Sequence, residues 1–194
     1  MSPQTKTHRR DVLRQLAGSL LAAMTLPLAG SGGASAQSPD APAAGSLGLP
    51  QARLLAGLGA AFPQRDEGRG NLYSGPGSVS DRFYSDNAHA TLETLGPAED
   101  VIALRYLYEL RDDDHPEATR DNRSYAFTLL RNVFPDWTES DAWLQAAIEE
   151  AEQKADRMAE PATIERSGIE VKVAYFVGAT ESIELQILPK GSYI

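Results

Sequence analysis

The chain of 194 residues contains no cysteine. This absence excludes disulfide bonds, cysteine-ligated iron–sulfur clusters, c-type haem, thiolate zinc sites and a cysteine nucleophile. The chain therefore lacks two common stabilising cross-links of small proteins, the disulfide bond and the thiolate metal centre. The folded state must be held together by its packed core alone.

Long hydrophobic runs are also missing. The least polar stretch, residues 15–28, is short and is interrupted by small polar residues and by Pro27, which disfavours a permanent membrane helix. Basic residues are outnumbered, with 18 Lys and Arg against 27 Asp and Glu, a net charge of −9. Such acidity argues against nucleic acids and anionic membrane surfaces as partners, because both require a basic face.

Familiar catalytic motifs are absent as well. No Gly-Lys-Ser/Thr follows the glycine-rich segment, no Gly-x-Ser-x-Gly nucleophile elbow occurs, and the acidic segment lacks the EF-hand spacing. Beyond residue 36 the chain holds only two histidines, His89 and His115, so a three-histidine zinc site within one chain is impossible. The sequence therefore indicates no particular reaction.

The N-terminus, by contrast, carries a distinct signal. It has a basic start, the short apolar stretch 15–28 and the small-residue cleavage site Ala34-Ser35-Ala36. The basic residues are Lys6, Arg9, Arg10 and Arg14. This arrangement predicts an export signal over residues 1–36, with Gln37 as the first mature residue. Residues 1–36 hold four of the basic and one of the acidic side chains, so the remainder carries 14 against 26, a net −12.

Residues 8–14 resemble the twin-arginine (Tat) export motif, Ser/Thr-Arg-Arg-x-Phe-Leu-Lys. The match retains Arg9, Arg10 and Leu13, and it departs from the motif at His8, Val12 and Arg14. The resemblance implies export of a folded protein to the periplasm or beyond, with the twin-arginine translocase and signal peptidase as partners. The membrane is then contacted only through the signal before cleavage. The alternative is an ordinary secretory signal that happens to contain Arg-Arg.

The mature chain has the length of a single domain. Residues 37–49, rich in Pro, Ala, Gly and Ser, are predicted to form a flexible tether, and residues 50–194 a single α+β domain. Helical periodicity predicts helices over 50–62, 101–110, 125–134 and 138–158, whereas 63–81 reads as a long loop and 82–95 is ambiguous. Alternating residues predict strands over 169–177 and 183–187, with 163–166 as an optional third strand. The predicted fold is four or so helices followed by a C-terminal antiparallel hairpin.

Two segments are candidate binding sites. The first is an acidic cluster that could bind Ca²⁺ or, with its histidine, a transition metal. It comprises Glu109, Asp112, Asp113, Asp114, His115 and Glu117. The second is the glycine-rich loop 68–81, whose backbone amides and hydroxyls could contact a ligand. Its candidate residues are Gly70, Ser74, Gly75, Gly77 and Ser78. A solvated turn and a plain surface loop are the respective alternatives.

Two further groups are weaker candidates. His89 with Asp86 or Glu93 could belong to a serine–histidine–acid triad. Five aromatic residues could line a pocket, although a core position fits them better, with Trp137 partly exposed. They are Tyr106, Tyr108, Tyr125, Trp137 and Trp143.

Three classes of function remain. We favour a non-catalytic accessory or partner-binding subunit, in line with the small size and the absence of a catalytic motif. The alternatives are a small metal-assisted hydrolase that uses the Asp112–Glu117 cluster and a protein that binds a small ligand.

Overall fold

The computed structural model describes residues 45–75, 77–110, 116–154, 160–177 and 180–194. Within these residues seven strands form one antiparallel sheet, in the order β1-β2-β3-β4-β7-β6-β5. The strands are β1 (Gln64–Asp66), β2 (Ser80–Tyr84), β3 (Ala90–Leu95), β4 (Ala103–Glu109), β5 (Ala162–Arg166), β6 (Ile169–Val177) and β7 (Glu181–Pro189). The helices are α1 (Gln51–Leu54), α2 (Pro116–Val133) and α3 (Ser140–Lys154).

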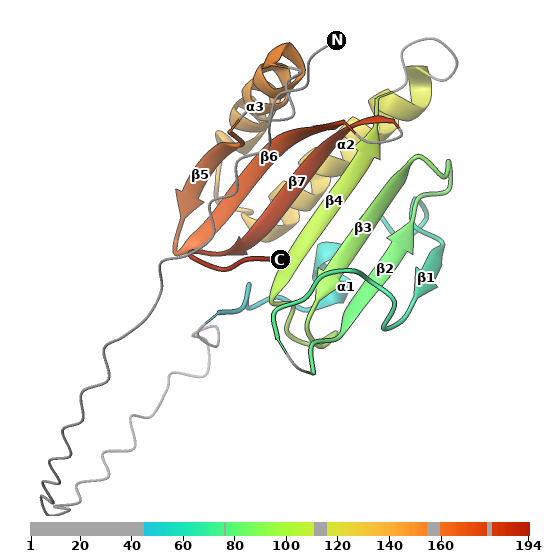
Figure 1. Ribbon diagram of the computed structural model, residues 1–194, viewed down its shortest axis with the longest axis vertical. Coiled ribbons are helices and arrows are strands. Elements are labelled where there is room, and N and C mark those ends of the chain that lie inside the picture. Colours follow the sequence, from blue (N-terminus) through green and yellow to red (C-terminus); the bar gives the residue numbers. More distant parts are fainter. Residues whose placement is uncertain (1–44, 76, 111–115, 155–159, 178–179) are drawn as a thin grey trace, which may run out of the picture. The chain divides into compact units, whose positions relative to one another are not determined.

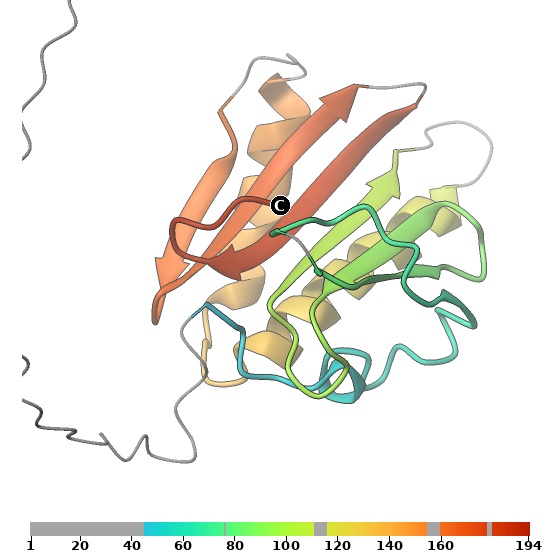
Figure 2. The ribbon, with the colours of Figure 1, turned by 60° about the horizontal axis from the view of Figure 1, so that its bottom comes forward.

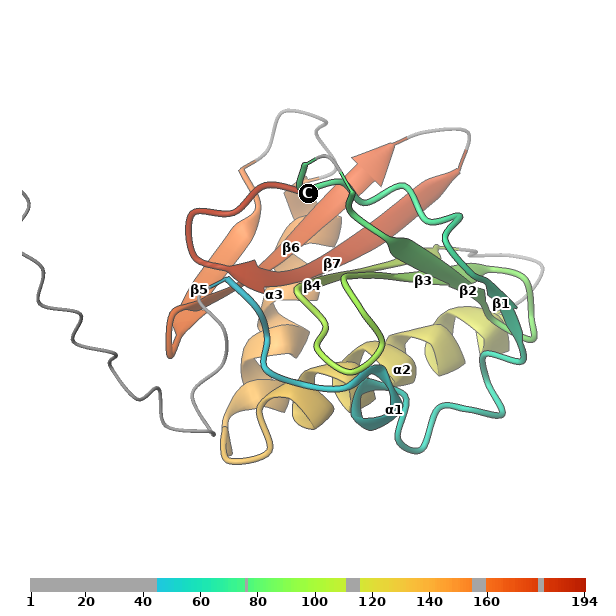
Figure 3. The same ribbon diagram turned by 90° about the horizontal axis from the view of Figure 1, so that it is seen from below.

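The chain builds the sheet from two meanders. Strands β1 to β4 follow one another, the chain then passes through α2 and α3, and β5 to β7 return so that β7 pairs with β4. The three helices lie against the same face of the sheet, as Figure 3 shows. On the opposite face the described residues form no helix, and the 67–79 segment and the C-terminal residues cross it (Figures 1 and 2).

The predicted fold class is wrong. The molecule is mainly a seven-stranded antiparallel sheet with three helices, not a set of helices followed by a hairpin. The C-terminal strands and helix α3 lie where periodicity predicted them, and 162–166 adds the third strand. The helix predicted over 125–134 is the second half of α2, which begins at Pro116. The error lies in the middle of the chain.

The segment predicted as a helix over 101–110 contains strand β4. Its apolar residues fit helical spacing, but they also alternate, with Leu104, Tyr106 and Tyr108 buried toward the helices and Arg105 and Leu107 on the other face. The preceding Pro97 does not start a helix: its carbonyl accepts from the Asp100 amide at 3.1 Å in the turn between β3 and β4. In this segment the alternation with a period of two residues, not the helical spacing, matches the structure that forms.

The ambiguous segment 82–95 is a β-hairpin. Strands β2 and β3 pair along their length, from Ser80 opposite Leu95 to Tyr84 opposite Thr91. Ala88 lies in the connecting turn with a φ of 60°. The predicted helix 50–62 is reduced to the single turn α1, followed by further turns.

The core lies between the sheet and the helices. It is formed by residues such as Leu92, Leu104, Leu130, Ile148 and Leu185, which are fully or almost fully buried. Tyr106 and Tyr108 belong to this core, as does Trp137, so the expected partial exposure of Trp137 is wrong. A smaller cluster on the open face packs Leu72 and Ile194 against Leu95, Ala103 and Leu188.

The predicted tether 37–49 overlaps the described fold. Leu47 and Leu49 are buried, and Leu49 forms an antiparallel bridge with Val101. Residues 45–49 are therefore part of the packed body, while 37–44 lie outside the described residues. Of the helices that the structure describes, none is both long and apolar enough to cross a membrane.

Candidate functional site

A cavity of about 430 Å³ opens where the β2–β3 turn meets the start of helix α2. We call it the acidic pocket. Its lining residues are Asp86, Asn87, His89, Glu117, Ala118, Asp121 and Tyr125. Within the described part of the chain the lining includes three carboxylates and no Lys or Arg. Two sequence candidates, Glu117 of the acidic cluster and the pair Asp86 and His89, thus meet at one place.

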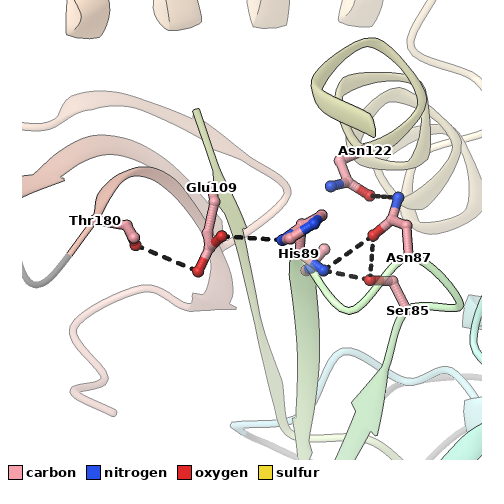
Figure 4. A network of polar contacts seen from close by, with 7 residues as sticks. Ser85, Asn87, His89, Glu109, Asn122 and Thr180 are labelled. Atoms are coloured by element: carbon pink, nitrogen blue, oxygen red, sulfur yellow. Dashed lines mark hydrogen bonds and ion pairs between the residues drawn. The ribbon is translucent and has the colours of Figure 1, made fainter. Parts of the chain in front are cut away.

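Asn87 organises the turn that forms one wall of the acidic pocket. Its Oδ1 accepts hydrogen bonds from the Ser85 hydroxyl at 2.7 Å and from the His89 amide at 3.0 Å (Figure 4). Its Nδ2 donates to Oδ1 of Asn122 on α2 at 3.0 Å. Ser85 Oγ also accepts from the Ala90 amide at 2.9 Å. These contacts hold the turn against the helix.

His89 is paired with Glu109 at the end of β4. The His89 Nδ1 lies 3.1 Å from Glu109 Oε2, and Glu109 Oε1 accepts from the Thr180 hydroxyl at 3.3 Å (Figure 4). A carboxylate on one ring nitrogen orients a histidine in metal sites and in acid–base catalysis alike. In the described contacts the acid at Nδ1 of His89 is therefore Glu109, which neither version of the triad hypothesis named. Asp86 lines the same cavity as His89, so a triad with Asp86 stays a prediction.

Glu93 has a different role. It lies on the open face of the sheet, almost wholly buried, and its carboxylate contacts Arg82 and Arg105 on the neighbouring strands. Arg82 Nε donates to Oε1 at 2.7 Å, and the Asn71 amide donates to the same oxygen at 3.1 Å. Glu93 therefore stabilises the sheet and the 67–79 segment.

The electrostatics of the acidic pocket are visible at Tyr125. Partial burial raises the pKa of the Tyr125 phenol, and the negative charges of Asp86 and Asp121 raise this pKa further. Both carboxylates are thus close enough to the ring to favour its neutral form. At neutral pH the pocket presents negative carboxylates beside a protonated phenol.

Asn122 lies beneath the acidic pocket with a donor unsatisfied. The residue is fully buried, its Oδ1 is taken by Asn87, and its backbone carbonyl accepts from the Tyr106 hydroxyl at 2.9 Å. Its Nδ2 meets no acceptor among the described residues, and in Figure 4 it lies on the side of His89. A buried donor without an acceptor costs about 1–3 kcal/mol of stability, and Asn122 is not among the residues that line the pocket.

The predicted metal site is only partly described. Asp112, Asp113, Asp114 and His115 lie outside the described residues, whereas Glu117 lines the acidic pocket. Among the described residues no three or more His, Asp or Glu side chains are grouped so that they could hold a metal ion. The export-signal residues Arg9, Arg10, Leu13, Ala34 and Ala36 also lie outside the described residues.

The predicted ligand loop folds back on itself. The Ser78 hydroxyl donates to the Gly75 carbonyl and accepts from the Ser74 amide, so it closes a local turn. The Gly70 amide donates to the Ser80 carbonyl at 2.6 Å. Gly77 and Ser78 line a second cavity of about 380 Å³, together with residues that include Arg65, Asp81 and Ile102. Ligand binding by this loop stays a prediction.

Comparison of the chain with protein-family models, with curated proteins and with solved structures found no match. The interpretation of the site therefore depends on its own geometry.

Sequence reasoning missed Asn87, Asp121 and Asn122 as parts of the site. Reading residues 82–95 as one segment hid the turn Ser85-Asp86-Asn87-Ala88-His89. Its Ser, Asp and Asn residues are typical of a turn between two strands. Nothing in the local sequence of α2 shows that Asp121 and Asn122 face this turn.

Proposed function

We propose that this chain is an exported, non-catalytic binding protein whose acidic pocket receives a basic side chain of its partner. One observation carries the proposal: Asp86 from the β2–β3 turn and Glu117 and Asp121 from α2 converge on one cavity. A cavity of this size, with charged groups from two separate elements in its lining, is typical of a ligand-binding site.

The chemistry of the acidic pocket suits an ammonium or guanidinium group. The carboxylates offer acceptors for its N–H groups, and the neutral Tyr125 ring offers a face for a cation–π contact. A Lys or Arg side chain in a peptide segment of a partner protein supplies such a group.

Export and charge fit the same proposal. The N-terminal signal directs the chain out of the cytoplasm, and the −12 charge that follows it attracts basic partners over long range. A twin-arginine route would deliver the chain folded, either alone or together with its partner.

Titration with a short Lys- or Arg-containing peptide amide, followed by NMR, tests this function. We expect shifts confined to residues 85–89 and to the first turns of α2, and weaker binding at high salt. The double substitution Asp86→Asn and Asp121→Asn should raise the Kd about tenfold, since each charge contributes about 0.5–1 kcal/mol. Glu149→Gln, an exposed change on α3, is the matched control.

Shifts scattered over the whole acidic surface, or equal binding by the double variant, would contradict the proposal. Equally tight binding of free arginine would instead indicate a small-ligand-binding protein.

A metal-assisted hydrolase is the second candidate. The observation that favours it is that Glu117 and His89 line one cavity, while Asp112–His115 lie just before Glu117 in the chain. A chelator should then lower the melting temperature, as should Asp113→Ala. An unchanged melting temperature in both experiments would exclude this candidate.

A further inference from the structure

Among the strands that the structure describes, β5 ends the sheet on one side and pairs with β6 alone (Figures 1 and 2). The strand at the other end, β1, has three residues, whereas β5 has five and exposes Thr163, Glu165 and Arg166. An edge strand of this length leaves backbone donors and acceptors available for another strand.

The β5–β6 turn shows which backbone groups these are. Ser167 and Gly168 both have a positive φ, 52° and 78°, which is typical of a two-residue type I′ turn. The flanking pair, Arg166 and Ile169, is then hydrogen-bonded, and such pairs alternate along the strands. Ile164 therefore bonds inward to β6. The amides and carbonyls of Thr163 and Glu165 point outward.

We propose that a second copy of this chain pairs antiparallel with β5 across a twofold axis at Ile164. Antiparallel pairing of the outward groups allows three symmetric registers. The register that places Glu165 opposite itself sets Thr163 against Ser167 of the β5–β6 turn, where the positive φ interrupts the strand. The register that places Thr163 opposite itself sets Glu165 against Pro161, which has no N–H to donate. The third register sets Thr163 opposite Glu165 of the other copy. The outward amides and carbonyls of both residues are then hydrogen-bonded.

This third register is also complementary in its side chains. Ile164 lies opposite its own copy on the helix-covered face, which gives an apolar contact at the axis. The guanidinium of Arg166 lies 4.5 Å over the Trp137 ring and 3.8 Å from the exposed Glu139 of its own chain, and its side chain is 44% exposed. In this register Arg166 is also the diagonal neighbour of Glu160 of the other copy. The charge of Glu165 is balanced within its own chain by Lys190, at 2.7 Å.

The absence of cysteine permits a sharp test with single substitutions in the full chain. In the proposed register the two Ile164 residues form a non-hydrogen-bonded pair, with Cα atoms about 4.5 Å apart, a distance that a disulfide can span. Ile164→Cys should therefore give a disulfide-linked dimer under mild oxidation. Thr163→Cys and Glu165→Cys should cross-link far more slowly, because each lies opposite the other residue. Ser74→Cys, in the 67–79 segment, is the control for random collision.

Light scattering of the unmodified chain should give twice the 20.9 kDa of one chain at micromolar concentration. Arg166→Glu should weaken the dimer, and adding Glu160→Arg should restore it. A mass of one chain, or cross-linking of Ile164→Cys no faster than of Ser74→Cys, would overturn the proposal. Faster cross-linking at position 163 or 165 would also overturn it. The acidic pocket lies on the β2–β3 turn and α2, so these results are independent of the peptide titration.

Discussion

At the scale of single residues, two buried carboxylates hold the 67–79 segment to the sheet. Asp81 faces the helices, and its Oδ1 accepts from the Gly68 amide at 2.8 Å. Glu93 faces the open side and accepts from the Asn71 amide. The segment is thus attached to both faces of the β2–β3 hairpin by backbone amides, while Leu72 is its one buried side chain among the described residues.

The substitution Glu93→Gln should destabilise the fold by about 3 kcal/mol at neutral pH, because it leaves Arg82 and Arg105 without their shared acid. Burial alone would raise the pKa of Glu93, but the hydrogen bond from Arg82 and the charge of Arg105 lower it below its ordinary 4.5. A lowered pKa stabilises the folded state above pH 4.5, and this contribution is lost as the pH falls through the folded pKa.

Urea unfolding at several pH values measures this effect. The stability difference between the wild type and Glu93→Gln should be largest at pH 7 and should shrink below pH 4.5. The exposed Glu99→Gln should show no such trend. A difference that stays constant down to pH 3 would contradict the assignment.

Gly70 is required for close packing. A Cβ at this position would lie 2.0 Å from Ser80 Oγ and 2.9 Å from the Ser80 carbonyl carbon, so the backbone would have to move. We expect Gly70→Ala to cost about 2 kcal/mol, seen as a melting temperature lower by about 5 °C. Gly59→Ala, with no atom within 4 Å of its Cβ and no positive φ, should leave the melting temperature nearly unchanged.

At the scale of elements, sequence periodicity predicts those with one buried face. Helix α2 buries Ala126, Leu129, Leu130 and Val133, and the same spacing is legible in the sequence. Strand β4 was missed because its residues suit both periods, and a central strand covered on both sides shows weaker alternation. On the open face Leu72 packs over Ala103 of β4, so this strand is covered on its second side as well. The local sequence does not reveal this contact.

The candidate site was only partly predictable for the same reason. His89, Asp86 and Glu117 could be selected as residue types able to bind or catalyse. Their meeting depends on the pairing of β3 with β4 and on the placement of α2 beside the β2–β3 turn. These are long-range contacts, and a single sequence does not contain them.

Residues 45–49, which precede α1, contribute buried side chains to the core. Leu49 is 7% exposed and pairs with Val101, so Leu49→Ala should cost about 2–3 kcal/mol. Chemical denaturation should show this loss, whereas Val79→Ala, at a residue that is 51% exposed, should change stability by less than about 0.5 kcal/mol. Equal stability of the two variants would place residues 45–49 outside the cooperative fold.

At the scale of the whole molecule, the predicted twin-arginine signal makes export a testable property of the paired arginines Arg9 and Arg10. A reporter fused to residues 1–36 should reach the periplasm, and Arg9→Lys with Arg10→Lys should retain it in the cytoplasm. Fractionation of cells measures both outcomes. Export that persists in the double variant would indicate the general secretory route instead.

The proposed binding function joins the acidic charge, the predicted export signal and the acidic pocket in one account. Its most direct test is affinity capture from a periplasmic extract, with the wild type and the Asp86→Asn, Asp121→Asn variant compared at equal loading. We predict a basic protein that is retained by the wild type and by Glu149→Gln, is released by salt, and is reduced at least severalfold on the double variant. Equal retention by all three proteins, or retention of no protein at all, would contradict the account.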